Sequence, residues 1–238
     1  ISKLALDGKR DEVKAQLIRA IRLVGVITVP SAVAFLLFGP LITQSIFVGI
    51  SNEDSRYIGY VLSALSFGLV AFSINLILIR GFNAFEDTRT QVASILVINI
   101  VSVAMSYFFL SFVKTQWVTI GLGVAFSVSY LVGLFVTLGL LKKHVGKLAI
   151  SEFLGQHLRL LIAYVLAMAP LFVMTQYISL LDIEFSRAAR AGELLVVMVV
   201  AFFAYILAAK ALRIEEISMI RHLGSSMSRR SAKTEENE

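Results

Sequence analysis

The chain has 238 residues, of which 58% are hydrophobic and 16% charged, and its mean hydropathy is +0.83. Ordinary globular chains are about half apolar and about a quarter charged, so this composition excludes a typical soluble domain. The absence of cysteine excludes disulfides, thiol catalysis and cysteine-based metal sites. Composition therefore predicts an all-α, polytopic membrane protein built as a bundle of transmembrane helices.

Six apolar stretches are long enough to cross a bilayer, because about 20 apolar residues span a hydrocarbon core of about 30 Å. In chain order they are 23–47, 57–79, 92–112, 118–141, 160–178 and 193–212. Their continuous apolar character argues against transmembrane strands, in which apolar and polar residues alternate. All three prolines, Pro30, Pro40 and Pro170, lie inside these stretches. Membrane helices tolerate proline when neighbouring groups satisfy the freed carbonyls.

Lysine and arginine are distributed unevenly among the connections between these stretches. With a cytoplasmic N-terminus, all but four of the 22 basic residues fall in segments 1–22, 80–91, 142–159 and 210–238. The four on the other side are Arg56, Lys114, Arg187 and Arg190. Because cytoplasmic loops are enriched in basic residues, both termini are predicted to be cytoplasmic. This asymmetry accounts for the formal charge of +6 without a nucleic-acid partner.

Three flanking segments differ from the spans. The lead-in 1–22 carries apolar residues at helical spacing, namely Val13, Leu17 and Ile21. In the segment 142–159 a similar stripe includes Ile150 and Phe153. We expect both amphipathic segments to lie at the membrane interface and to lead into a span. The tail 213–238 becomes polar toward its end, and we expect most of it to be disordered.

Polar side chains inside the spans indicate helix faces that are turned away from lipid. In the third span, one face carries Asn99, Ser102 and Ser106, and in the second span Asn75 lies close to Arg80 in sequence. Helix packing and the wall of a polar cavity both remain open as interpretations. The fourth span has small residues at every fourth position, which favours close helix packing. They are Gly121, Ala125, Ser129, Gly133 and Thr137.

No acidic residue lies deep within a span, and no phosphate-binding loop, nucleophile motif or metal-ligand spacing occurs in the chain. The sequence therefore predicts no enzyme, no cofactor and no metal site. The three histidines, His144, His157 and His222, lie near predicted cytoplasmic boundaries, where a solvated or interfacial position is expected.

The most distinctive string, RGFNAFEDTRT, covers residues 80–90 between the second and third spans. Asp87 or Thr88 is suited to cap the incoming helix, since a side-chain oxygen there accepts from free amide groups of the first turn. Arg80 and Arg89 have two open roles: pairing with nearby carboxylates, or contacting lipid headgroup phosphates.

With this string the chain resembles the MurJ/MviN family of lipid II flippases, within the larger group of multidrug, oligosaccharidyl-lipid and polysaccharide exporters. The family pattern here is Arg-x-Phe-Tyr-x-x-x-Asp-Thr-(Arg/Lys)-Thr-Pro-Val. The matching residues are Arg80, Phe82, Asp87, Thr88, Arg89, Thr90 and Val92. Asn83 replaces the usual tyrosine and Gln91 the usual proline, so the helix start differs chemically. Stretches 1–13 and 22–47 are also similar to the family, and weaker similarity continues to about residue 212.

The resemblance implies a transporter of fourteen spans, of which this chain is a C-terminal portion beginning at Ile1. The four spans in 23–141 resemble the end of the second six-helix lobe. The two in 160–212 resemble the extra C-terminal helices, which in the family line a groove for the polyprenyl tail of lipid II. The family's main cavity arginines lie in regions with no counterpart here.

The implied function is outward translocation of undecaprenyl-pyrophosphate-linked peptidoglycan precursor across the bacterial cytoplasmic membrane by alternating access. The implied partners are lipid II or a related polyprenyl-linked saccharide, membrane lipids, and the missing N-terminal portion of the transporter. Arg80, Asn99 and Asn75 are the candidate substrate-binding residues. Two alternatives remain open: a flippase or exporter of another polyprenyl-linked oligosaccharide or of drugs, and a membrane scaffold for a cytoplasmic regulatory domain.

Overall fold

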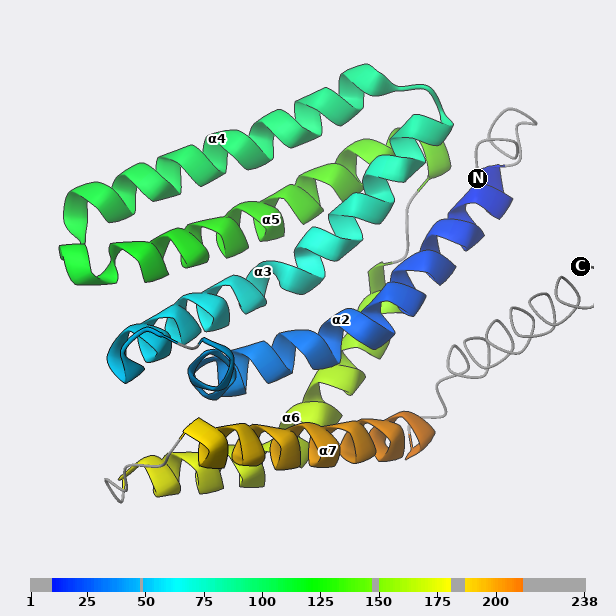
Figure 1. The fold of residues 1–238 in the computed structure, drawn as a ribbon. Coiled ribbons are helices and arrows are strands. Elements are labelled where there is room, and N and C mark those ends of the chain that lie inside the picture. The colour runs from blue at the N-terminus through cyan, green and yellow to red at the C-terminus, as the bar shows by residue number, and fades with distance from the viewer. Residues whose placement is uncertain (1–9, 48, 147–149, 181–186, 212–238) are drawn as a thin grey trace, which may run out of the picture.

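The computed structural model describes residues 10–47, 49–146, 150–180 and 187–211. Within them the chain forms six α-helices (Figure 1). They are α2 (Arg10–Ile46), α3 (Asn52–Ala84), α4 (Thr88–Phe112), α5 (Thr115–Val145), α6 (Ile150–Leu180) and α7 (Arg187–Ala211). All six are long and apolar enough to cross a membrane, which confirms the all-α class and the number of predicted spans.

The helices pack in an order that differs from their order in the chain. From one side of the molecule to the other, α4 packs on α5, α5 on α3, and α3 on α2 (Figure 1). Helices α6 and α7 pack on each other and on α2. The connection from α3 to α4 lies at the same end of the bundle as the start of α2. Helix α2 therefore contacts both the α3–α5 layer and the pair formed by α6 and α7, called here the α6–α7 pair.

Helix α2 is much longer than a membrane span requires. Its 37 residues correspond to about 55 Å, against a hydrocarbon core of about 30 Å. The predicted lead-in is the first part of this same helix, starting at Arg10. Val13, Leu17 and Ile21 are fully buried, so protein and not the membrane interface covers this apolar stripe.

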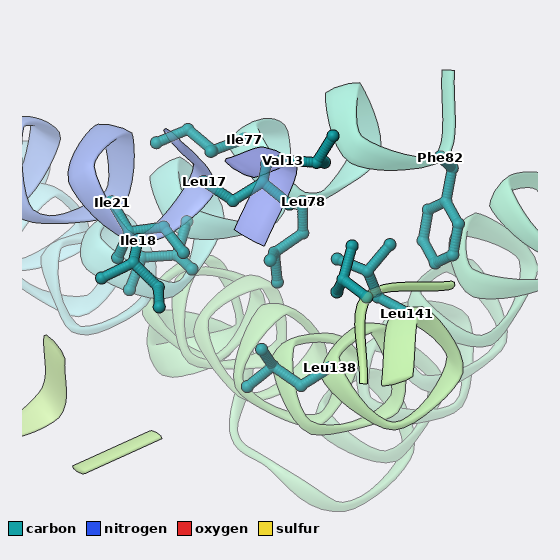
Figure 2. Close-up of a cluster of buried hydrophobic side chains, with 11 residues drawn as sticks. Val13, Leu17, Ile18, Ile21, Ile77, Leu78, Phe82, Leu138 and Leu141 are labelled. Carbon is teal, nitrogen blue, oxygen red and sulfur yellow. The ribbon is translucent and has the colours of Figure 1, made fainter. Parts of the chain in front are cut away.

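The first core cluster forms where the N-terminal part of α2 meets the C-terminal parts of α3 and α5 (Figure 2). Leu78 and Phe82 of α3 and Leu141 of α5 lie in it, together with the stripe of α2. Each of these three side chains has no exposed surface. Since the cluster joins three helices at one end of the bundle, it fixes the positions of the connections that begin there.

A second core cluster joins the C-terminal part of α2 to the α6–α7 pair. It contains Val33 and Phe38 of α2, Tyr164 and Met168 of α6, and Val197 of α7. Phe38 also packs edge to face against Phe172 of α6, with ring centroids 6.3 Å apart. Its α2 residues all follow Pro30, whereas those of the first cluster all precede it, so the two cores lie on opposite sides of that proline along α2.

Small residues allow the close approach of α4 and α5. A Cβ atom at Gly121 would collide with the ring of Phe109, and one at Gly133 with the side chain of Ile98. Thr137 hydrogen-bonds Ser94 at 2.5 Å. Three members of the small-residue ladder on α5 therefore face α4, which confirms helix packing as the role of the ladder.

Two groups of sequence-based expectations lie outside the described residues. The tail 213–238, with His222, is one of them. The side chains of Ile150 and Phe153 are the other, so the proposed stripe of the segment 142–159 is described only from Leu154 onward. All three prolines lie inside helices as expected, Pro30 and Pro40 in α2 and Pro170 in α6.

Candidate functional site

The candidate site is the end of the bundle where α3 ends, α4 begins and α5 ends. Here α3 stops at Ala84, and the chain reverses direction within three residues before α4 starts. The amide groups of Phe85 and Asp87 both donate to the carbonyl of Phe82, at 3.0 and 3.1 Å. Glu86 adopts a left-handed backbone conformation with φ of 55°, which is what allows so tight a reversal.

Asp87 is the N-cap of α4. Its Oδ1 accepts a hydrogen bond from the amide of Thr90 at 3.0 Å, and so satisfies a donor that has no partner inside the helix. This confirms capping as a role of the string at residues 80–90 and selects Asp87 over Thr88. The connection is therefore ordered by its own side chains.

His144 in the last turn of α5 completes the site. Its Nε2 lies 2.7 Å from Oδ2 of Asp87. The imidazole stacks on the ring of Phe85, with centroids 5.1 Å apart and an angle of 17°, and meets Phe82 edge-on. A single imidazole therefore ties the end of α5 to the start of α4. The sequence-based expectation of a solvated or interfacial His144 missed this contact.

These contacts stabilise the ionised carboxylate of Asp87. Hydrogen bonds from the side chain and then the amide of Thr90, followed by the bond with His144, lower the pKa of Asp87 from 3.8 to about 2. Donors directed at a carboxylate favour its charged form, so Asp87 stays ionised at any physiological pH.

Arg80 and Arg89 flank this connection, and both side chains are exposed. Neither forms a salt bridge with any carboxylate in the described part of the chain; the ion pair at this connection is His144 with Asp87. Lys142 and Lys143 of α5 are also exposed and precede His144 directly. We call Arg80, Arg89, Lys142 and Lys143 the cationic end. Pairing of the two arginines with carboxylates is thus not seen in the described part of the chain, and contact with phosphate groups stays a prediction.

The structure separates the three candidate substrate-binding residues. Arg80 is exposed at the end of α3, and Asn99 is exposed near the middle of α4. Asn75 has no exposed surface. The face of α4 that packs on α5 carries Ser94 and Ile98, the only buried residues of that helix. Asn99 lies beside this face and is open to the surroundings.

Asn75 connects three helices by hydrogen bonds. Its Nδ2 donates to the carbonyls of Ala71 and Tyr130, both at 3.0 Å, and its Oδ1 accepts from the hydroxyl of Thr137 at 2.9 Å. Thr137 in turn bonds Ser94. In this conformation Asn75 binds helices α3 and α5 together, and its side chain reaches no open surface that a substrate can approach.

The α6–α7 pair presents a second candidate surface, which is apolar. Exposed large apolar side chains cover α6 and α7 along their length. On α6 they include Leu158, Ile162, Leu166 and Val173, and on α7 Leu195, Met198, Phe202 and Phe203. Such faces suit acyl or prenyl chains. No group of three or more potential metal ligands occurs in the described part of the chain.

Comparison with known proteins finds a family model that matches this chain, described as MurJ, lipid II flippase MurJ. The match covers residues 1–199, which include all of α2 to α6 and about half of α7. No curated protein matches the chain.

Proposed function

Because the chain belongs to the MurJ family of lipid II flippases, we propose that it moves lipid II outward across the bacterial cytoplasmic membrane as part of a transporter that works by alternating access. Transporters of this family are not enzymes, so no covalent step is required of the chain. The observation that carries the proposal is the family match over residues 1–199. Six helices able to cross a membrane support it.

The chemistry of the substrate divides between two surfaces. A sugar-pyrophosphate head needs cationic and hydrogen-bonding groups, because its charge is costly to bring into a bilayer. Exposed Arg80 and Asn99 supply such groups on the cavity side, in our proposal. Asn75 supports them indirectly, because it joins α3, which carries Arg80, to α5, on which α4 with Asn99 packs.

The polyprenyl tail needs an apolar surface that opens to lipid. The α6–α7 pair offers one, since Leu166 and Phe202 belong to exposed apolar faces that run along both helices. We assign the tail to this pair and the head to the wall formed by α3 and α4. This division keeps the charged and apolar parts of the lipid on different helices.

The orientation in the membrane follows from charge in this proposal. The cationic end lies at the end of the bundle where α2 begins, whereas exposed Arg56 and Lys114 lie at the opposite end. With the cationic end in the cytoplasm, the exposed arginines and lysines there meet anionic headgroups of the inner leaflet.

We expect the segment 1–238 not to transport by itself, because the resemblance implies a fourteen-span transporter whose main cavity arginines have no counterpart in this segment. In a strain depleted of its own flippase, the complete gene should restore growth, and the segment alone should not. Growth restored by the segment alone would contradict this expectation. Translocation of labelled lipid II in vesicles, compared with other polyprenyl-linked sugars, then separates lipid II from the alternative substrates.

A further inference from the structure

Pro30 leaves one backbone carbonyl of α2 without its usual partner. In an α-helix the carbonyl of residue 26 accepts from the amide of residue 30, and proline has no amide hydrogen. Val26 is only 2% exposed, so its carbonyl lies deep inside the protein. Within a bilayer an unsatisfied carbonyl is costly, because no water is present to replace the missing donor. A donor from another part of the chain is therefore needed at this place.

Tyr205 of α7 supplies that donor. Its hydroxyl donates to the carbonyl of Val26 at 2.9 Å, across 179 positions of sequence. The ring of Tyr205 is held edge-on by Tyr164 of α6, with centroids 6.2 Å apart. One hydroxyl thus satisfies the carbonyl that Pro30 frees and joins α7 to α2, while the neighbouring ring of α6 orients it.

Apolar packing alone holds α7 weakly. Of the side chains described in α7, only Val197 is buried. A second hydrogen bond, from the hydroxyl of Ser45 to the carbonyl of Arg190 at 3.2 Å, joins the far ends of α2 and α7. Between α2 and α6 the imidazole of His157 fills the space that a Cβ at Gly25 would need. Contacts between α2 and the α6–α7 pair therefore lie on both sides of Pro30, at Gly25 and Val26 before it and at Ser45 after it.

We propose that Tyr205 is a positioning residue, which fixes the α6–α7 pair on α2 by binding the carbonyl that Pro30 frees. The hydrogen bond itself is argued from the structure alone. Its consequence for transport rests on the proposed function, since the α6–α7 pair is the surface assigned to the lipid tail. We call Pro30 and Tyr205 together the device: the proline leaves the carbonyl of Val26 free, and the hydroxyl of Tyr205 donates to it.

A double-mutant cycle on the purified full-length protein tests the device without any substrate. Tyr205→Phe should lower the melting temperature by roughly 2 °C, because the carbonyl of Val26 loses its donor. In a Pro30→Ala background the same change should have no effect, since the amide of residue 30 then serves that carbonyl. An equal drop in both backgrounds would overturn the proposal.

Two matched controls come from α6. Pro170→Ala also removes a proline from a helix, but in α6, so the full effect of Tyr205→Phe should persist there. Tyr177→Phe deletes one tyrosine hydroxyl from α6 where the side chain is 63% exposed, and should leave the melting temperature unchanged. Coupling of Tyr205 to Pro170 as large as that to Pro30 would count against the device.

A transport assay distinguishes a role of Tyr205 in positioning the α6–α7 pair from a role in stability alone. Movement of labelled lipid II in vesicles, measured well below the melting temperature of every variant, should fall several-fold with Tyr205→Phe in the Pro30 background, because α7 has lost its tie to α2. In the Pro30→Ala background the same change should alter transport little. An equal loss of transport in both backgrounds would show that Tyr205 acts in transport independently of Pro30 and would overturn the device. Coupling in the melting temperature without any change in transport would leave the hydrogen bond standing but refute both positioning and the assignment of the tail to α7.

Discussion

The interface between α3 and α5 brings the two backbones much closer together than the interface between α2 and α7 does. Between α3 and α5, backbones approach at Gly68 and Ser127, and Asn75 links the two helices by a chain of buried hydrogen bonds. Between α2 and α7, one buried valine and two side-chain-to-carbonyl bonds carry the contact. Helices in a bilayer gain little from the hydrophobic effect, so close backbones and satisfied polar groups distinguish a fixed interface from a separable one.

The largest effect on stability is expected at Gly68, where the close backbones of α3 and α5 leave no room for a larger side chain. A Cβ atom there would lie 2.6 Å from the Cα of Ser127, so Gly68→Ala should destabilise the protein by about 2–3 kcal/mol through a forced backbone shift. Gly155→Ala in α6 is the control, since nothing lies within 4 Å of its Cβ and alanine favours a helix. Thermal unfolding in detergent measures both. Equal tolerance of the two changes would refute a tight α3–α5 interface.

The second largest effect on stability is expected at Asn75, which begins the buried chain of hydrogen bonds between α3 and α5. Asn75→Leu removes the link to Tyr130 and leaves the hydroxyl of Thr137 with Ser94 alone, which should cost about 1–2 kcal/mol in a membrane protein. Ser73→Ala should have little effect, because its hydroxyl donates to the carbonyl of Leu69 in its own helix. The same unfolding assay compares them. A stable Asn75→Leu variant would show that packing alone fixes α3 on α5.

Asp87 should make stability depend on pH under acidic conditions. Its pKa is lowered from 3.8 to about 2 on folding, so its contribution is complete above about pH 4 and is lost as the pH falls toward 2. Asp87→Asn keeps an N-cap residue but removes the charge. The melting temperature of this variant should therefore fall less between about pH 4 and pH 2 than that of the parent. Identical pH profiles would contradict the ionised cap.

The smallest effect on stability is expected at Arg80. Its side chain is exposed and no ion pair holds it, so Arg80→Ala should change stability by less than about 0.5 kcal/mol. Growth supported by the full-length gene should nevertheless fall if Arg80 serves the substrate head. Arg56→Ala, also exposed but at the opposite end, is the matched control. Full complementation by Arg80→Ala would restrict the residue to a structural or orienting role.

Local sequence patterns predicted the features that depend on residues near one another in the chain. Apolar runs predicted the six helices, Asp87 was a candidate cap, and the spacing of small residues on α5 predicted close packing with a neighbour. Each of these follows from the residues of one segment. The lead-in was the exception, since its apolar stripe gave no sign that α3 and α5 cover it.

The remaining features depend on pairs that are distant in the chain. His144 lies 57 positions from Asp87, and Tyr205 lies 179 positions from Val26. A hydrophobic period contains no information about which helix faces which, so these contacts had no local signal. Pro30 could have raised the question, because a proline inside a predicted span requires a donor from elsewhere in the protein. Asn75 shows the reverse: its polarity indicated a face turned away from lipid, but only the structure shows that its hydrogen bonds go to other groups inside the bundle.

Because α2 is long, it contacts both cores, one on each side of Pro30. The first core holds α2 through residues that precede Pro30, and the second core holds it through Val33 and Phe38, which follow. The part of α2 that follows Pro30 is also held on α3, where Thr43 donates to the carbonyl of Ser55 and Ser63 donates to the carbonyl of Phe35. Any movement of the α6–α7 pair relative to α3 and α5 would therefore have to occur at the surface of α2 on which the pair packs, and the hydroxyl of Tyr205 bonds across that surface.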